Sequence, residues 1–178
     1  MAHLKLYDVQ VTFAEIPGEI CLCIYFSGCP IQCPECNSKW LWKDVGVVLK
    51  MPQLRNIIDA HPNVTCIVFM GGDQDPKGVN RFIRYVYFHY KQKYKIAWYR
   101  GGTKLENLDC LNFIKTGPYN SRYGPLNEIT TNQRLYEIEH DGVNIVKDIT
   151  HRMWPVNVRT NETQNLFQED LSGDLPED

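Results

Sequence analysis

Short apolar segments alternate with amphipathic ones through the middle of this 178-residue chain, and that order limits the possible folds more than any other feature. Four segments have the composition of strands that a sheet buries on both faces: residues 20–26, 64–70, 96–99 and 113–116. Apolar side chains repeat at helical spacing from Pro52 and over residues 77–94, and a short helix is expected around residues 104–108. Because strands that alternate with helices form parallel sheets, we expect an α/β protein.

The two ends of the chain have different patterns. Residues 4–13 alternate loosely between apolar and polar side chains and predict a first or edge strand. Residues 134–139 and 143–149 flank the turn sequence Asp141-Gly142, which predicts a hairpin near the end of the domain.

The length of the chain favours one domain, which we expect over residues 1–160. Residues 161–178 are acidic and polar, a composition typical of a solvated, flexible tail. The formal net charge of -2 gives no electrostatic reason to expect a nucleic-acid or membrane partner. Neither a long apolar span nor a secretory signal is evident, so we expect a cytoplasmic protein.

Three of the seven cysteines crowd into the segment FSGCPIQCPECNS, at Cys29, Cys33 and Cys36. An odd number of cysteines argues against a full disulfide framework and favours metal binding. A [4Fe-4S] cluster takes one thiolate per iron, so three thiolates from one loop would leave one iron open to a substrate. A tetrahedral zinc site is the alternative, with a fourth ligand from a histidine or from another cysteine. Of the other cysteines, Cys21, Cys23 and Cys66 are expected to be buried in the core, whereas Cys110 is expected as a free thiol, either at the surface or buried.

The segment FSGCPIQCPECNS at the end of one strand, followed by MGGDQDP at the end of the next, resembles the radical S-adenosylmethionine superfamily. Within it, the chain is most similar to the activating proteins of anaerobic ribonucleotide reductases, as the stretches KTGPY and TTNQRLYEI also indicate. The resemblance implies a truncated, TIM-like barrel of mostly parallel strands with flanking helices and a C-terminal hairpin. Aspartate in Gly-Gly-Asp, where much of the superfamily has glutamate, and Glu35, where an aromatic residue is common, depart from the pattern.

The resemblance also implies the residues of the site. Cys29, Cys33 and Cys36 would hold the [4Fe-4S] cluster as catalytic metal ligands, and Gly71, Gly72 and Asp73 would bind the methionine part of S-adenosylmethionine. By itself, Gly-Gly-Asp is more simply a turn after a strand. Tyr99 ends the 96–99 strand and Arg100 follows it, at the edge where parallel sheets bind ligands. Contact with the adenosine part of the cofactor and a plain loop without such contact are equally good interpretations.

The implied activity is that of a radical enzyme which cleaves S-adenosylmethionine reductively and removes a hydrogen atom from a glycine of class III ribonucleotide reductase. Its partners would be the catalytic subunit of that reductase and an electron donor such as flavodoxin or ferredoxin. Two alternatives stay open. One is a small radical enzyme acting on a nucleoside, a peptide or another glycyl-radical enzyme, and the other is a non-enzymatic iron–sulfur or zinc binding module.

Overall fold

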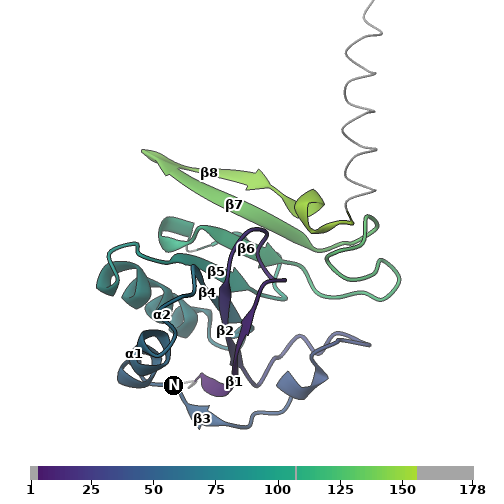
Figure 1. The fold of residues 1–178 in the computed structure, drawn as a ribbon. Coiled ribbons are helices and arrows are strands. Elements are labelled where there is room, and N and C mark those ends of the chain that lie inside the picture. The colour runs from purple at the N-terminus through teal and green to yellow at the C-terminus, as the bar shows by residue number, and fades with distance from the viewer. Residues whose placement is uncertain (1–3, 107, 156–178) are drawn as a thin grey trace, which may run out of the picture.

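The computed structural model describes residues 4–106 and 108–155, and these residues form one eight-stranded sheet flanked by two α-helices (Figure 1). The strands are β1 Lys5–Thr12, β2 Cys21–Phe26, β3 Val47–Val48, β4 Cys66–Met70, β5 Lys95–Tyr99, β6 Phe113–Thr116, β7 Arg134–Asp141 and β8 Val143–Asp148. The α-helices are α1 Met51–Asp59 and α2 Pro76–His89, and short 3-10 helices are η1 Lys39–Leu41, η2 Leu108–Cys110 and η3 Thr150–Met153.

The sheet has a parallel centre and antiparallel edges. Its strand order is β3-β1-β2-β4-β5-β6-β7-β8, in which β2, β4, β5 and β6 run parallel to one another. On one side β1 pairs antiparallel with β2 and β3, and on the other β7 pairs antiparallel with β6 and β8. The described sheet is open, and the partial barrel implied by the resemblance stays a prediction.

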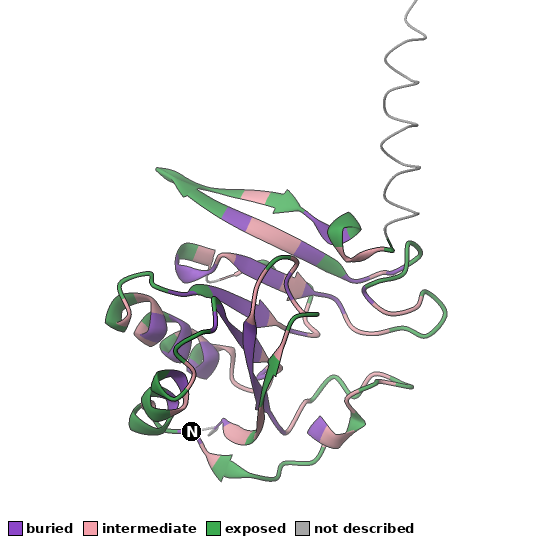
Figure 2. Cartoon of the chain, in the orientation of Figure 1, coloured by how far each residue is buried: buried purple, intermediate pink, exposed green. Residues whose placement is uncertain are grey.

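Both faces of the parallel centre are covered, which explains why its strands are apolar at consecutive positions. The helices α1 and α2 cover one face, where Leu22, Phe69 and Trp98 are fully buried among helix residues such as Ile58 and Ile83. On the opposite face, side chains such as Cys23, Val68 and Phe113 lie beneath loop residues that include Ile16, Leu41, Leu126 and Ile149. Figure 2 shows these central strands as an almost continuous buried layer.

The predicted strands of the middle segment lie within two residues of the observed ones, whereas two helix predictions differ from the structure. The helix expected over residues 77–94 ends at His89, because Lys91 and Gln92 adopt φ values of 48° and 62° that no α-helix accommodates. The helix expected around residues 104–108 is wrong, since one 3-10 turn over Leu108–Cys110 takes its place. The predicted hairpin is confirmed as β7 and β8.

The start of α2 fixes the chain immediately after β4. Pro76 occupies the first turn of the helix, and the side chain of Asp75 accepts a hydrogen bond of 2.9 Å from the backbone N–H of Gly78. The position of the MGGDQDP segment is therefore set by a buried strand on one side and a capped helix on the other.

The tail expected over residues 161–178 lies outside the described residues. Within residues 4–106 and 108–155, none of the helices has the length and apolar character needed to cross a membrane.

Candidate functional site

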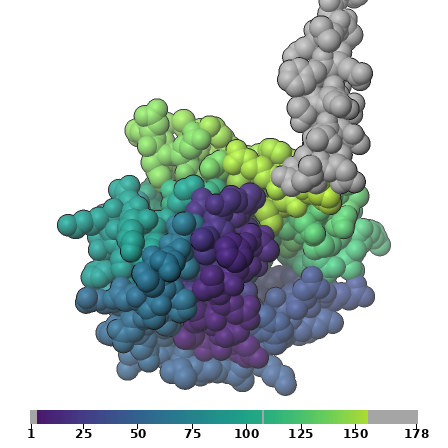
Figure 3. All heavy atoms as spheres, viewed as in Figure 1, coloured from purple at the N-terminus to yellow at the C-terminus, as the bar shows by residue number. Residues whose placement is uncertain are grey.

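The predicted site residues gather at the carboxyl ends of the four parallel strands, the edge at which parallel sheets bind ligands. The cysteine loop follows β2, Gly71 to Asp73 follow β4, Arg100 follows β5, and Lys115 lies near the end of β6. Figure 3 shows the cysteine-loop region, in slate blue, beside the purple strand β1 on the side away from the blue helix α1 and the teal helix α2. The rings of Tyr7 and Trp40 meet there with centroids 4.9 Å apart.

Two backbone hydrogen bonds shape the cysteine loop. The backbone N–H of Cys29 donates to the carbonyl of Leu41 at 2.9 Å, so the first cysteine is held against the later part of the loop, at the end of η1. A tight turn carries the N–H of Cys36 to the carbonyl of Cys33 at 3.0 Å, with Glu35 at a φ of 60°. These turns give the loop a compact form around its three thiols.

All three loop thiols are free and half-buried, and backbone N–H groups approach two of the sulfurs. Burial raises the pKa of the Cys29 thiol, and hydrogen bonds from the backbone of Ile31 and Gln32 partly oppose that rise. The N–H of Ser38 donates to Sγ of Cys36 at 3.3 Å. Because N–H groups directed at sulfur stabilise thiolates and tune iron–sulfur clusters, the loop fits such a cluster.

Among the described residues, no group of three histidine, cysteine or acidic side chains is arranged to hold a single metal ion. Such an arrangement is needed for a mononuclear site, in which three or four ligands surround one ion. In a [4Fe-4S] cluster each thiolate binds a different iron, so the sulfurs are spread around the cluster and need not converge on one point.

The other four cysteines are buried in the core, as predicted for Cys21, Cys23 and Cys66, and Cys110, whose burial the sequence left open, is buried as well. Cys21 and Cys66 are partners in the register of β2 and β4, at the amino ends of both strands. Burial also raises the pKa of the Cys23 thiol, in the middle of β2, well above its usual range. Cys110 precedes β6 and is likewise distant in the sheet from the carboxyl edge. In the described part of the chain, therefore, that edge carries only the three loop cysteines.

Gly71 and Gly72 form a sharp turn at the end of β4, with φ values of 81° and 87° that favour glycine. Gly71 is held on both sides by β5, because its N–H donates to the carbonyl of Tyr99 at 2.8 Å and its carbonyl accepts from the indole of Trp98 at 2.8 Å. A methyl group on Gly72 would lie 2.3 Å from Cγ2 of Val79. The turn therefore places backbone that carries no side chains at the site.

We expect Gly72→Ala to destabilise the fold by about 2–5 kcal/mol, since a left-handed conformation costs about 1–2 kcal/mol and an overpacked contact about 1–3 kcal/mol. Urea unfolding of the apo-protein measures this change. Gly142→Ala is the matched control, because Gly142 has a φ of 71° with no atom near the added methyl group. Equal losses in the two variants would contradict the contact with Val79.

Asp73 ties the turn after β4 to the turn after β5. Its side chain is 3% exposed, and its two oxygens accept hydrogen bonds from the N–H of Gly101 at 2.9 Å and of Gly102 at 3.1 Å. The guanidinium Nε of Arg100 lies 3.3 Å from the same carboxylate. A carboxylate has about four acceptor positions, and these contacts use three of them.

Arg100 and Tyr99 both have protein partners that the sequence did not indicate. The guanidinium of Arg100 pairs with Glu106 at 2.5 Å as well as with Asp73, and it lies 4.4 Å above the ring of Trp98. The hydroxyl of Tyr99 donates to the backbone carbonyl of Glu15. Contact of either side chain with adenosine stays a prediction, and the structure assigns Arg100 to the anchoring of Asp73.

Sequence reasoning missed the specific contacts of two residues at this edge. Gln74 donates its side-chain amide to the carbonyl of Ser27 at 2.5 Å, which joins the Gly-Gly-Asp turn directly to the start of the cysteine loop. Lys115 donates to the carbonyl of Gly117 at 2.8 Å. Burial lowers the pKa of Lys115 to about 8, and the negative groups Cys33, Asp73, Cys36 and Cys29 oppose that shift. The cysteine loop reaches the part of the edge next to Lys115, because the side chain of Ile31 packs over Gly101, just after β5.

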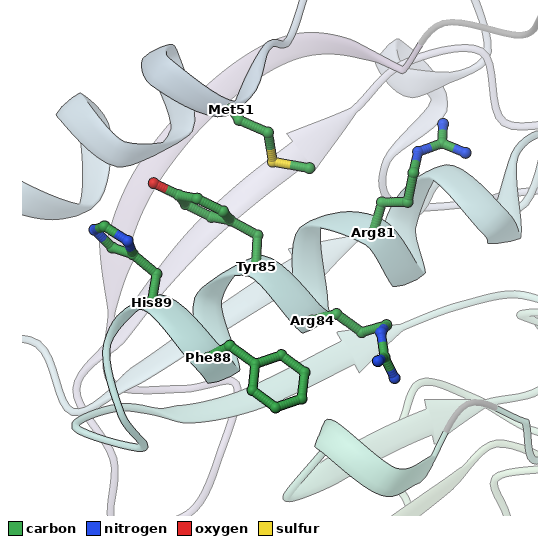
Figure 4. Close-up of a pocket in the computed structure, with 6 residues that line it drawn as sticks. All are labelled: Met51, Arg81, Arg84, Tyr85, Phe88 and His89. Atoms are coloured by element: carbon green, nitrogen blue, oxygen red, sulfur yellow. The ribbon is translucent and has the colours of Figure 1, made fainter.

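A surface groove lies apart from this edge, on the outer side of the helices (Figure 4). It is lined by Met51 of α1 and by Arg81, Arg84, Tyr85, Phe88 and His89 of α2. None of these residues belongs to the cysteine loop or to the Gly-Gly-Asp turn.

A loop with three half-buried thiols and N–H groups directed at two of the sulfurs fits an iron–sulfur protein. Comparison with known families agrees, since the model of the 4Fe-4S single cluster domain family matches residues 16–117. The match spans more than half of the chain and includes every predicted site residue, so this protein belongs to the 4Fe-4S single cluster domain family. The predicted [4Fe-4S] cluster is thereby confirmed at the level of the family. None of the curated proteins and none of the solved structures matches the chain.

Proposed function

We propose that this protein is a radical S-adenosylmethionine enzyme that activates an anaerobic (class III) ribonucleotide reductase. In this proposal Cys29, Cys33 and Cys36 hold the cluster, and the enzyme removes a hydrogen atom from a glycine of the reductase, leaving a glycyl radical. The substrate is thus a protein, and a flavodoxin or ferredoxin supplies the electron.

The observation that carries the proposal is the direct link between the two motifs. Gln74, next to the Gly-Gly-Asp turn, binds the backbone of Ser27 at the start of the cysteine loop. Asp73 faces the same sheet edge and interacts electrostatically with Cys29. The proposed cluster ligands and the proposed site for an amino acid group would therefore share one edge, which supports the proposal.

The residues of this chain have separate tasks in the proposed reaction. When bound, the cluster supplies one electron and an iron with an open coordination position. Gly71 and Gly72 let the backbone approach the methionine part of the cofactor because they carry no side chains. The remaining acceptor position of Asp73 suits a charge-assisted hydrogen bond from the methionine ammonium group. Burial of Asp73 strengthens that bond because little water competes for it.

Anaerobic reconstitution followed by incubation with S-adenosylmethionine and dithionite tests the proposal. We expect a brown protein with about four irons per chain, formation of 5′-deoxyadenosine, and a glycyl radical signal in electron paramagnetic resonance after the candidate reductase is added. Product without a radical on the reductase would indicate the alternative of another small radical enzyme. Iron without product would indicate a binding module, and a colourless zinc protein would exclude the proposal.

A further inference from the structure

Lys115 is a cation at the part of the sheet edge against which the cysteine loop packs, since Ile31 of the loop lies over Gly101, just after β5. It lies near the end of β6 as the register partner of Tyr99 in β5, and the backbone N–H of Arg100 donates to its carbonyl at 3.0 Å. Its neighbours in the strand alternate between the two faces, with Ile114 under the helices and Phe113 on the opposite face. Lys115 therefore projects on the face opposite the helices.

Negative groups of the site stabilise the charged form of Lys115. Cys33, Asp73, Cys36 and Cys29 all favour its charged form, in that order, and the Lys115 charge also lowers the pKa of the Glu15 carboxyl. Only one hydrogen bond to protein is formed by the ammonium in the described residues, to the carbonyl of Gly117. Donor positions thus remain for further acceptors.

The other cations near the loop are less suited to act on it. Arg100 is buried, but its charge is balanced by Asp73 and Glu106. Lys39 and Lys43 belong to the loop itself and are exposed, so water screens their charges. Asp73 in turn is neutralised by Arg100, which leaves the Lys115 charge opposed mainly by Glu15 and the thiols.

We propose that Lys115 stabilises the reduced form of the cluster by placing a positive charge at the sheet edge that carries its three thiolate ligands. The proposal rests on the proposed function, since it needs the cluster on Cys29, Cys33 and Cys36. Addition of one electron increases the negative charge of the cluster, and a cation held at low dielectric favours that increase. Lys115 is thus a positioning residue that sets how readily the cluster accepts its electron.

A redox titration of the reconstituted protein, followed by electron paramagnetic resonance without S-adenosylmethionine, tests this inference. We expect Lys115→Gln to lower the ratio of reduced to oxidised cluster at a fixed potential by about tenfold, which equals about 59 mV for a one-electron couple. Lys115→Arg keeps the charge and should stay within about threefold of the wild type. Lys95→Gln makes the same change at the amino end of β5, where the lysine pairs with Glu19, and should leave the ratio unchanged.

The outcomes separate this inference from the proposed function. A fully loaded Lys115→Gln protein with an unchanged ratio would overturn the role of Lys115 and leave the function standing, as would an arginine variant that behaves like the glutamine variant. If Lys115→Gln loses its iron, Lys115→Met replaces it. Loss of iron from both neutral variants but not from Lys115→Arg would support the role of the Lys115 charge. Equal loss of iron from all three variants would overturn that role. Iron retained by a Cys33→Ala variant would instead count against the proposed ligands.

Discussion

Replacing Cys33 with alanine should leave a folded protein that no longer retains its cluster. The thiol of Cys33 is half-buried in the loop and belongs to neither apolar core, so its loss removes little packing. It is, however, the thiol that acts most strongly on Lys115 in the electrostatics of the site. We expect the iron content to fall from about four per chain to less than about one, because two thiolates cannot hold the cluster.

The same variant should lose 5′-deoxyadenosine formation by at least about 100-fold, since even the groups that support metal ligands are worth about 10–100-fold. Iron analysis, the visible absorption spectrum and product analysis after anaerobic reconstitution measure the effect. Cys110→Ala is the matched control, because Cys110 is 4% exposed in the core and distant from the loop. It should keep its iron and its activity. A Cys33→Ala protein with unchanged iron would mean that other residues hold the cluster.

Local patterns in the sequence predicted the parts of the fold that depend on local burial. A strand such as β2 is recognisable because every one of its residues is buried, and the sequence is accordingly apolar at consecutive positions. The end of α2 was not recognisable, because Tyr90 and Tyr94 continue the helical spacing while Lys91 and Gln92 turn the backbone into the left-handed region. Neither lysine nor glutamine is a residue type that indicates a left-handed conformation.

Short spacings within one loop identified the cluster motif, whereas contacts between loops could not be predicted. Asp73 accepts hydrogen bonds from Gly101 and Gly102, whose N–H groups are aimed at it only once β4 and β5 lie side by side. Lys115 lies at the same sheet edge as the cysteine loop only because β2 and β6 belong to one parallel sheet, with β4 and β5 between them. Such contacts follow from strand order and register, which the one-dimensional pattern does not contain.

Asp73→Asn should be the most damaging substitution that keeps the size of the side chain. The amide presents an NH₂ group where the carboxylate accepts from the N–H groups of Gly101 and Gly102, so one donor would face another. Arg100 would lose a buried carboxylate that lies 3.3 Å from its Nε. Removing one partner of a buried ion pair costs about 3–5 kcal/mol, and we expect a loss of this size in urea unfolding of the apo-protein.

A second effect of Asp73→Asn concerns the cofactor. If Asp73 receives the methionine ammonium, the neutral amide replaces a charge-assisted hydrogen bond with a weaker one. The dissociation constant for S-adenosylmethionine, measured on protein of equal iron content, should then rise by about tenfold or more, which corresponds to about 1.4 kcal/mol. Anchoring alone, without contact to the cofactor, would destabilise the fold and leave this constant nearly unchanged at a temperature where both proteins are folded.

Glu106→Gln provides the matched control for both effects, because Glu106 pairs with the same guanidinium group from a side chain that is 39% exposed. Exposed ion pairs contribute at most about 1 kcal/mol, so this variant should lose little stability and no affinity for S-adenosylmethionine. Asp73→Glu separates charge from length, since it keeps the negative charge but moves the oxygens by one methylene group. Recovery of cofactor affinity without recovery of stability in Asp73→Glu would assign the charge to the cofactor and the short side chain to the turn at Gly101 and Gly102.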